Sequence, residues 1–391
     1  MAATNQRFAN YSVKDIVRPN ILALKPYRCA RDDFSSGILL DANENAYGPA
    51  LNPESEAAVA SSGLDINRYP DPHQHDLKNL IKQFRNIPGG PENFFLGVGS
   101  DEVIDMIFRV FCVPGKDAVL ITPPTYGMYS VCAQINDVEV HKATLTLDGR
   151  FQLNVEEIEK QVEAHPNIKV IFLCSPGNPT GSALSHESMR RVLTMPNYKG
   201  IVAIDEAYVD FIEADKEGST ATWVKEYPNL IVMQTMSKSF GLAGVRLGVA
   251  ITQPEIALYM NSTKAPYNIA STTSRVAQEA LQPKGLEILD KHIAVMIQER
   301  SRLLEAFKSI SGLGRVLGTN DSNFVLVEVL DKEGKPSNER AFSVYTDMAK
   351  SEGLVVRFRG TEIGCEGCLR ITVGTPEEND VVIQRLTQQL A

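Results

Sequence analysis

The 391-residue sequence lacks the features that mark several special classes of protein. No apolar run approaches the roughly 18 residues that a membrane-spanning helix needs, and residues 1–7 lack the apolar core of a secretory signal. Internal repeats and low-complexity linkers are also absent. We therefore expect a cytoplasmic protein without a membrane partner.

Positive charge is scarce as well. The chain has 39 Lys and Arg against 48 Asp and Glu, a net charge of −9, and no local basic stripe interrupts this balance. A nucleic-acid partner is therefore not expected. A small anionic substrate is still compatible with this composition, because a few arginines in a pocket can override the global sign.

Cysteine and histidine patterns give no metal or redox motif. Six cysteines do not make a disulfide scaffold in a chain of this length. Cys365 and Cys368 form the only Cys-x-x-Cys, which lacks the second pair of a structural zinc site and the strand-to-helix setting of a thioredoxin motif. His73 and His75 have no carboxylate pattern beside them. We expect a tight turn at the cysteines, a solvated loop at the histidines and no metal.

Short apolar runs alternate with polar helical stretches between about residues 75 and 265. This pattern indicates a mostly parallel sheet covered by helices on both faces. Ligands collect at the carboxyl ends of the strands in such sheets. The expected strands are Ala118–Ile121, Val170–Leu173, Ile201–Ile204, Ile231–Met233 and Leu247–Ile251.

The pattern changes after about residue 280. A long helical stretch, Leu286–Ser309, is followed by three strand-like runs and by a closing helix from Pro376. This succession predicts a smaller α+β domain that packs closely on the first. The three runs are Phe324–Val329, Leu354–Phe358 and Leu369–Val373.

A lysine and an aspartate lie at the ends of two of the expected buried strands. Lys238 follows the apolar run that ends at Met233, and Asp205 ends the run Val202–Ile204. A lysine can form a Schiff base with an aldehyde cofactor, and a carboxylate can hold a pyridinium nitrogen. An unpaired carboxylate is otherwise a costly group at the end of a buried strand. The pair therefore indicates a pyridoxal 5′-phosphate site.

Other groups that such a cofactor needs are nearby in the sequence. Tyr208 can donate a hydrogen bond to the ring phenolate, and so can Asn178 from a turn rich in proline and glycine. Tyr126 can supply an aromatic wall against the ring. The alternative interpretations are that Asn178 is an ordinary turn residue and that Tyr126 belongs to the core.

Candidate phosphate ligands surround Lys238 and also begin a predicted helix. Ser237 and Arg246 offer a hydroxyl and a guanidinium group. Ser100 and Asp101 precede an apolar pattern with helical spacing, and free N–H groups at a helix start bind phosphate. Glu102 occupies the position of the third glycine of a dinucleotide fingerprint, which disfavours an oxidoreductase that uses NAD.

Together these segments resemble the fold-type I aminotransferases, through SPGNPTG (175–181), DEAY (205–208) and SKSFGLAGVRLG (237–248). Within that group the chain is similar to the histidinol-phosphate aminotransferase family of class II, from about residue 16 to the C-terminus. The segments that carry this narrower resemblance are LDANEN (40–45), RYPD (68–71), GSDE (99–102), PTYGMY (124–129) and CLRITVGT (368–375).

The resemblance implies a fold and a domain division. It implies an α/β, fold-type I transferase whose large domain has a mostly parallel seven-stranded sheet, with a smaller α+β domain beside it. The expected parts are residues 1–63, an N-terminal arm with part of the small domain; residues 64–280, the large cofactor-binding domain; and residues 281–391, the small C-terminal domain.

The resemblance also implies roles for residues. Lys238 would bind the cofactor covalently, Asp205 the ring nitrogen, Tyr208 and Asn178 the phenolate, while Tyr126 would stack on the ring. The phosphate would be bound by Ser237, by Arg246 and by the backbone around Ser100 and Asp101, and by Tyr69 of a neighbouring subunit in a homodimer. Arg370 and Arg357 would hold substrate anions, with Arg359 as an alternative to Arg357, and Tyr27 and Asn43 would line the substrate pocket.

The implied reaction is transamination between L-histidinol phosphate and 2-oxoglutarate, which belongs to histidine biosynthesis. Paired arginines can bind either a phosphate monoester or a carboxylate, so one pocket can serve both substrates. A related aminotransferase acting on aromatic amino acids and a threonine-phosphate decarboxylase of the same fold share nearly all cofactor residues. A non-catalytic cofactor-binding protein is the alternative from a different class.

Overall fold

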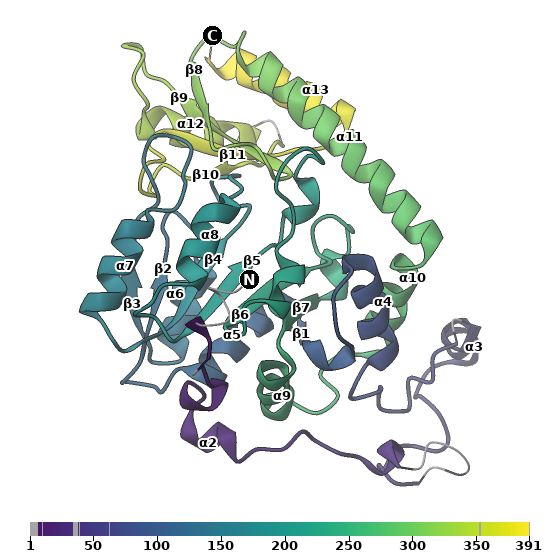
Figure 1. Ribbon diagram of the computed structural model, residues 1–391. Helices are drawn as coiled ribbons and strands as arrows, with labels where there is room; N and C mark the ends of the chain where they lie inside the picture. The colour runs from purple at the N-terminus through teal and green to yellow at the C-terminus, as the bar shows by residue number, and fades with distance from the viewer. Residues whose placement is uncertain are drawn as a thin grey trace.

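The computed structural model describes residues 7–9, 11–33, 38, 40–61, 63–351 and 353–390. Its centre is a seven-stranded sheet with the order β1-β7-β6-β5-β4-β2-β3 (Figure 1). All neighbouring strands run parallel except β7, which is antiparallel to both β6 and β1. The mostly parallel seven-stranded sheet is therefore confirmed. The strands are β1 (Phe94–Val98), β2 (Ala118–Ile121), β3 (Glu139–Lys142), β4 (Ile168–Cys174), β5 (Ile201–Asp205), β6 (Leu230–Thr235) and β7 (Leu247–Thr252).

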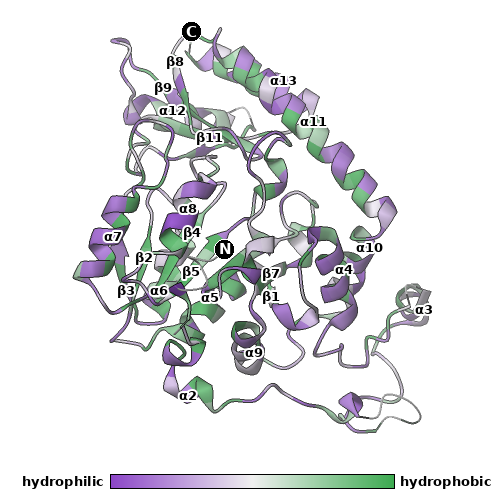
Figure 2. Ribbon diagram, in the orientation of Figure 1, coloured by the Kyte–Doolittle hydropathy of each residue, from purple (hydrophilic) through white to green (hydrophobic). Residues whose placement is uncertain are grey.

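Both faces of this sheet are buried, which explains why its central strands are continuously apolar. Side chains alternate across a strand, so Val202 and Ile204 pack in one core cluster while Ile201 and Ala203 pack in another. Figure 2 shows hydrophobic residues concentrated in these strands. The first cluster is completed by helices α4 (His75–Arg85), α7 (Val155–Ala164) and α8 (His186–Leu193), and the second by α5 (Gly99–Phe111), α6 (Met128–Ile135) and α9 (Pro254–Thr263).

A second, antiparallel sheet follows in the order β10-β11-β9-β8 and has its own core cluster. The long helix α11 extends from the region of α10 (Ser271–Ala280) to this sheet and contacts α13 there (Figure 1). The strands are β8 (Leu313–Leu317), β9 (Phe324–Val329), β10 (Arg357–Phe358) and β11 (Cys368–Thr372). The helices are α11 (Pro283–Phe307), α12 (Asn338–Ser351) and α13 (Pro376–Leu390).

The sequence missed three strands and overextended one. β3 is an edge strand whose residues are mostly polar, and β8 contains a glycine and an arginine, so neither has the apolar run of a buried strand. The predicted strand Leu354–Phe358 is reduced to β10, because only Arg357 and Phe358 pair with β11. The third missed strand, β1, adjoins the antiparallel strand β7 at the other edge of the large sheet.

The N-terminal segment runs along the edge of the molecule, and α3 projects from it (Figure 1). Its elements are the 3₁₀ helices η1 (Val13–Asp15) and η2 (Ala30–Asp32) and the helices α2 (Pro19–Leu22) and α3 (Pro53–Ser61). No helix in the described part of the chain is both long and apolar enough to cross a bilayer.

Candidate active site

A cavity of about 420 Å³ opens between the two sheets. Cys174, Asp205 and Thr235, the last residues of β4, β5 and β6, all line it. The strands are parallel, so their carboxyl ends meet at one edge of the sheet, where ligands bind in folds of this kind. The other lining residues are Ser100, Asp101, Tyr126, Asn178, Ala207, Tyr208, Ser237, Lys238, Ala243, Arg246, Arg357, Arg359 and Arg370.

The structure thus brings most of the predicted site residues into one cavity and leaves three outside it. Tyr69 and Asn43 line a neighbouring depression, and Tyr27 lines another. Tyr267 contacts two of these three residues. Its ring stacks on that of Tyr69 with centroids 4.6 Å apart, and its hydroxyl lies 3.2 Å from that of Tyr27. Tyr69 remains 53% exposed, so its side chain is available to a neighbouring molecule.

Asp205 is a buried carboxylate without a cationic partner. Its side chain accepts hydrogen bonds from the Tyr129 hydroxyl at 2.8 Å and from the backbone N–H of Ala207 at 3.1 Å. Among the described residues no cation forms an ion pair with it. Burial raises the pKa of Asp205 to about 6, although the two hydrogen bonds oppose that rise. A cationic ring nitrogen would supply the missing charge.

Tyr129 was not predicted from the sequence. It lies in the first turn of α6, and its ring packs between Tyr126, with centroids 5.7 Å apart, and Phe172, at 4.9 Å. Its setting resembles that of a core tyrosine. Its place within the segment PTYGMY, three residues after Tyr126, was the only available signal.

Lys238 follows β6 and points its ammonium toward the Tyr208 ring, 5.5 Å from the ring centroid. It has no hydrogen-bond acceptor or ion-pair partner within the described ranges. Burial, followed by the nearby Arg370 charge, lowers the pKa of Lys238. A lysine in this environment is more readily deprotonated than a surface lysine and can therefore act as a nucleophile.

The start of α5 and the guanidinium of Arg246 form an anion cradle. Gly99 adopts a φ of 76°, and a Cβ there would collide with the Arg246 guanidinium. Arg246 contacts Asp101 only loosely, at 3.4 Å, and its side chain is 45% exposed. Ser237 lies beside this group, with its hydroxyl 2.9 Å from that of Thr235. Free N–H groups, a hydroxyl and a guanidinium suit a phosphate.

These groups fit pyridoxal phosphate. The cavity offers an amine for the aldehyde, a carboxylate that lacks a cation and a cradle that lacks an anion. Asn178 accepts a hydrogen bond from Arg370 Nη1 at 2.5 Å through its oxygen, which leaves its amide nitrogen for an oxygen of a ligand. Burial raises the pKa of Tyr208, so this phenol remains protonated and can donate to the ring oxygen.

Three arginines form the opposite wall of the cavity. Arg357 and Arg370 are directly paired across β10 and β11, and Arg359 is held by Glu362, with Nη1 and Oε1 2.8 Å apart. The Nε atoms of Arg359 and Arg370 are buried without an acceptor. Burial, and then the charges of its arginine neighbours, lower the pKa of Arg370. One carboxylate cannot neutralise three guanidinium groups, so this wall can bind an anionic ligand.

Comparison with known proteins identifies the class. The chain matches the family "Aminotransferase class I and II" over residues 35–386 and belongs to it. It is a pyridoxal-phosphate-dependent aminotransferase with the fold-type I architecture.

Individual relatives narrow the comparison. The chain is 49% identical to a histidinol-phosphate aminotransferase of Candida maltosa over 385 residues, covering 96% of this chain and 97% of that one. It is also 49% identical to the enzyme of the same name from Schizosaccharomyces pombe, with 96% and 97% covered. The crystal structure of histidinol-phosphate aminotransferase from Sinorhizobium meliloti in complex with pyridoxal-5′-phosphate has the same fold, with a TM-score of 0.73, 24% identity and 89% of each chain covered.

The remaining sequence predictions concern metals and redox chemistry. The described part of the chain contains no cluster of three or more His, Cys, Asp or Glu side chains that could hold a metal ion. Cys365 and Cys368 are buried thiols, joined by a backbone hydrogen bond of 3.0 Å between the N–H of Cys368 and the oxygen of Cys365. The expected tight turn is therefore present.

Proposed function

We propose that this enzyme transfers the amino group of L-histidinol phosphate to 2-oxoglutarate, giving imidazole acetol phosphate and L-glutamate, as a step of histidine biosynthesis. The observation that carries the proposal is an arginine wall facing a lysine–aspartate cluster across one cavity. The names of the relatives that are 49% identical over nearly the whole chain support the choice of substrate.

Residues that line the cavity would hold the cofactor. Asp205 binds the ring nitrogen, Tyr208 and Asn178 the phenolate, and Tyr126 the ring face. Ser237, Arg246 and the backbone around Ser100 and Asp101 bind the phosphate. When bound, pyridoxal phosphate supplies an electron-withdrawing ring that carries the amino group between the two substrates.

Lys238 would move the proton. Because the pKa of Lys238 is lowered, its neutral amine can take a proton from the α-carbon of the substrate. The resulting ammonium can then deliver this proton to the cofactor. Asp205, fixed by Tyr129, keeps a negative charge beside the ring nitrogen throughout. This charge stabilises the cationic ring and hence the electron-rich transition state.

The arginines would select the substrate. Arg370 lines the cavity and donates to Asn178 from one nitrogen, while its Nε is buried without an acceptor. Arg357 lies directly opposite Arg370, and Arg359 follows two residues later. These two arginines would bind the distal anion, which is a phosphate in one half-reaction and a carboxylate in the other. Both line the cavity, so both are assigned to the distal anion.

A homodimer would complete the site. Tyr27, Asn43 and Tyr69 lie outside the cavity of their own chain, and the nearby Tyr47 is fully exposed at 100%. A second copy would bury this apolar surface and receive Tyr69 at its phosphate cradle. We also propose the division of the chain into residues 1–63, 64–280 and 281–391.

Hybrid dimers test the shared site. Lys238→Ala and Tyr69→Ala variants, each of low activity alone, are mixed, dissociated and reassociated. Activity should return, because one of the two sites in a hybrid dimer has both residues intact. No recovery, together with a monomeric mass by analytical ultracentrifugation, would contradict the shared site.

A direct assay tests the substrate. The purified enzyme with 2-oxoglutarate is offered histidinol phosphate, phenylalanine, tyrosine and threonine phosphate, and glutamate formation and carbon dioxide release are both measured. We expect the highest kcat/KM for histidinol phosphate and no carbon dioxide. A preference for an aromatic amino acid would replace the proposed substrate, and decarboxylation of threonine phosphate would replace the proposed reaction.

A further inference from the structure

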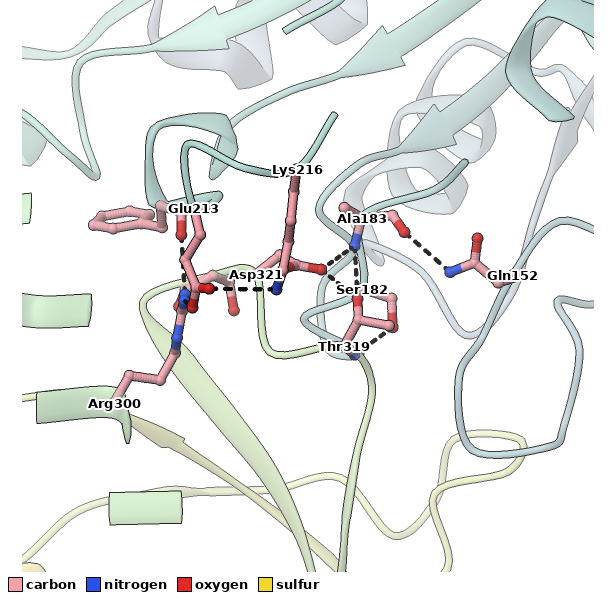
Figure 3. Close-up of polar contacts among 10 residues, drawn as sticks. Gln152, Ser182, Ala183, Glu213, Lys216, Arg300, Thr319 and Asp321 are labelled. Atoms are coloured by element: carbon pink, nitrogen blue, oxygen red, sulfur yellow. Dashed lines mark hydrogen bonds and ion pairs between the residues drawn. The ribbon is translucent and has the colours of Figure 1, made fainter. Parts of the chain in front are cut away.

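A buried arginine joins the two sheets outside the cavity. Arg300 lies on α11 and is only 2% exposed. Its guanidinium donates to the backbone oxygen of Phe211 at 3.0 Å, to that of Ser322 at 2.9 Å and to Oε1 of Glu213 at 2.9 Å (Figure 3). Phe211 follows β5 of the large sheet, whereas Ser322 precedes β9 of the small one. One side chain therefore ties both segments together.

A second ion pair lies beside it and spans the same junction (Figure 3). Lys216 Nζ is 2.8 Å from Oδ1 of Asp321, whose side chain is 2% exposed. The other oxygen of Asp321 accepts from the backbone N–H of Ala183 at 3.1 Å and from the Thr319 hydroxyl. We call Arg300, Glu213, Lys216 and Asp321 the inter-sheet latch. Arg300 and Asp321 are buried, so removing the partner of either one leaves a buried charge unpaired and is costly, which gives the junction a defined geometry.

The latch lies next to Tyr208, which lines the cavity, and to the buried Phe324, which packs against it. The chain segment between β5 and Phe211 contains Tyr208, and Phe324 lies just after Ser322. The rings of Tyr208 and Phe324 meet edge to face with centroids 5.2 Å apart. The guanidinium of Arg370 lies over the same Phe324 ring, 5.2 Å from its centroid. Phe324 thus stands between a cofactor ligand and a substrate ligand.

We propose that Arg300 is a positioning residue that sets the distance between Tyr208 and Arg370. It fixes the backbone on both sides of the Tyr208–Phe324 contact, so the phenol on the cofactor side and the arginine on the substrate side keep one geometry. The inference rests on the proposed roles of Tyr208 and Arg370. It adds that catalysis depends on a residue that touches neither cofactor nor substrate.

The test compares substitutions on one helix. Arg300→Met removes the donors, and Arg300→Lys retains a charge that can bond two carbonyls. Arg302→Met is the control, because Arg302 bonds Glu299, Asp380 and the Pro376 oxygen where α11 meets α13. We expect Arg300→Met to raise KM for the amino donor and for 2-oxoglutarate roughly ten-fold and to weaken pyridoxal-phosphate binding to the apoenzyme. Arg300→Lys should recover most of both losses, and Arg302→Met should change neither.

The proposal is overturned if Arg300→Met loses thermal stability but keeps the KM values and the cofactor affinity of the wild type. If Arg300→Met does not fold, Phe324→Leu takes its place, because it removes the intermediate ring and should raise the same KM values. Unchanged KM values for Phe324→Leu would then overturn the proposal. Kinetics are measured with glutamate–2-oxoglutarate exchange, so that a wrong histidinol phosphate assignment is distinguishable from a failed latch.

Discussion

Two carboxylates at and just after the end of β5 differ in whether a cation pairs with them. Asp205 ends β5 and has only a hydroxyl and an N–H as partners. Asp210, in the 3₁₀ helix Val209–Phe211, is paired with Arg85 at 2.5 and 3.0 Å and accepts from the Ser239 hydroxyl at 2.5 Å. Burial is the largest influence on the pKa of each group and raises it. At Asp210 the charge of Arg85 and the hydrogen bonds from Arg85 and Ser239 together outweigh burial, so its pKa is lowered.

Cations differ in the same way. Arg300 in the latch has three acceptors, whereas Lys238 in the cavity has none in the part of the chain that the structure describes. The supporting framework thus satisfies its own charges and can fold without a ligand. The cavity leaves its charges unmatched, and a ligand with a cationic ring and an anionic tail completes them. Buried charged groups without a partner of opposite charge therefore distinguish the active site from the framework around it.

The largest expected effect comes from removing the unpaired amine. Lys238→Ala should lower steady-state transamination by at least about 10³-fold, because the group that moves the proton is lost. The fold should be retained, because no described side chain pairs with Lys238. Circular dichroism checks the fold, and Lys291→Ala, which alters an exposed ion pair with Glu287, serves as the control. Normal turnover by Lys238→Ala would refute its assignment.

Removing the unpaired carboxylate of Asp205 tests whether it serves the ring nitrogen of the cofactor. Asp205→Ala should lower kcat by about 10²- to 10³-fold, the range for loss of a preorganised electrostatic partner. The reason is that the ring nitrogen loses the charge that keeps it cationic. Wild-type kcat in this variant would show that Asp205 does not serve the ring.

Stability of the apoenzyme should distinguish the two carboxylates by sign. The raised pKa of Asp205 means that its stabilising contribution is present below about pH 4 and lost as pH rises through about 6. Asp205→Asn should therefore increase the free energy of unfolding at neutral pH, by about 3 kcal/mol for a shift of roughly two pKa units. Asp210 contributes stability above its unfolded pKa, and Asp210→Asn should decrease the free energy of unfolding by about 3 kcal/mol, because Arg85 loses its partner.

Urea denaturation of the apoenzyme at neutral and acidic pH measures both changes. The effect of Asp205→Asn should vanish below about pH 4, where the carboxyl group is neutral. Destabilisation by both substitutions at neutral pH would mean that the two sites do not differ as described.

The sequence predicted most strands that have continuous apolar runs and missed β3 and β8, which lack such runs. It also missed β1, although Phe94–Val98 is an apolar run that is largely buried. Ala118–Ile121 and Phe324–Val329 match β2 and β9 at both ends, because each is buried along its whole length. β3 lies at the edge of its sheet with partly exposed polar residues, and no alternation or apolar run marks it. The pairing of such an edge strand with β2 cannot be predicted from its own residues.

The same limit applies to the site. Residues within contiguous motifs, such as Asp205 and Lys238, could be proposed directly because their chemistry is concentrated in short segments. Arg300 could not, because its partner Phe211 is 89 positions away and nothing local distinguishes a buried arginine from a surface one. Tyr27, Asn43 and Tyr69 stay predictions, because a single chain does not contain the neighbour that they would serve.

The smallest expected effect concerns the arginine that is partly paired. Arg359 has one carboxylate partner, Glu362, so it is intermediate between the unmatched Lys238 and the satisfied Arg300. Arg359→Gln should raise KM for histidinol phosphate about ten-fold, because a charge-assisted contact to the phosphate is lost, and should leave kcat nearly unchanged. Glu362→Gln should lower that KM, because Arg359 loses its competing partner. Steady-state kinetics with both substrates measure these changes, and equal, unchanged KM values in both variants would assign the distal anion to Arg357 alone.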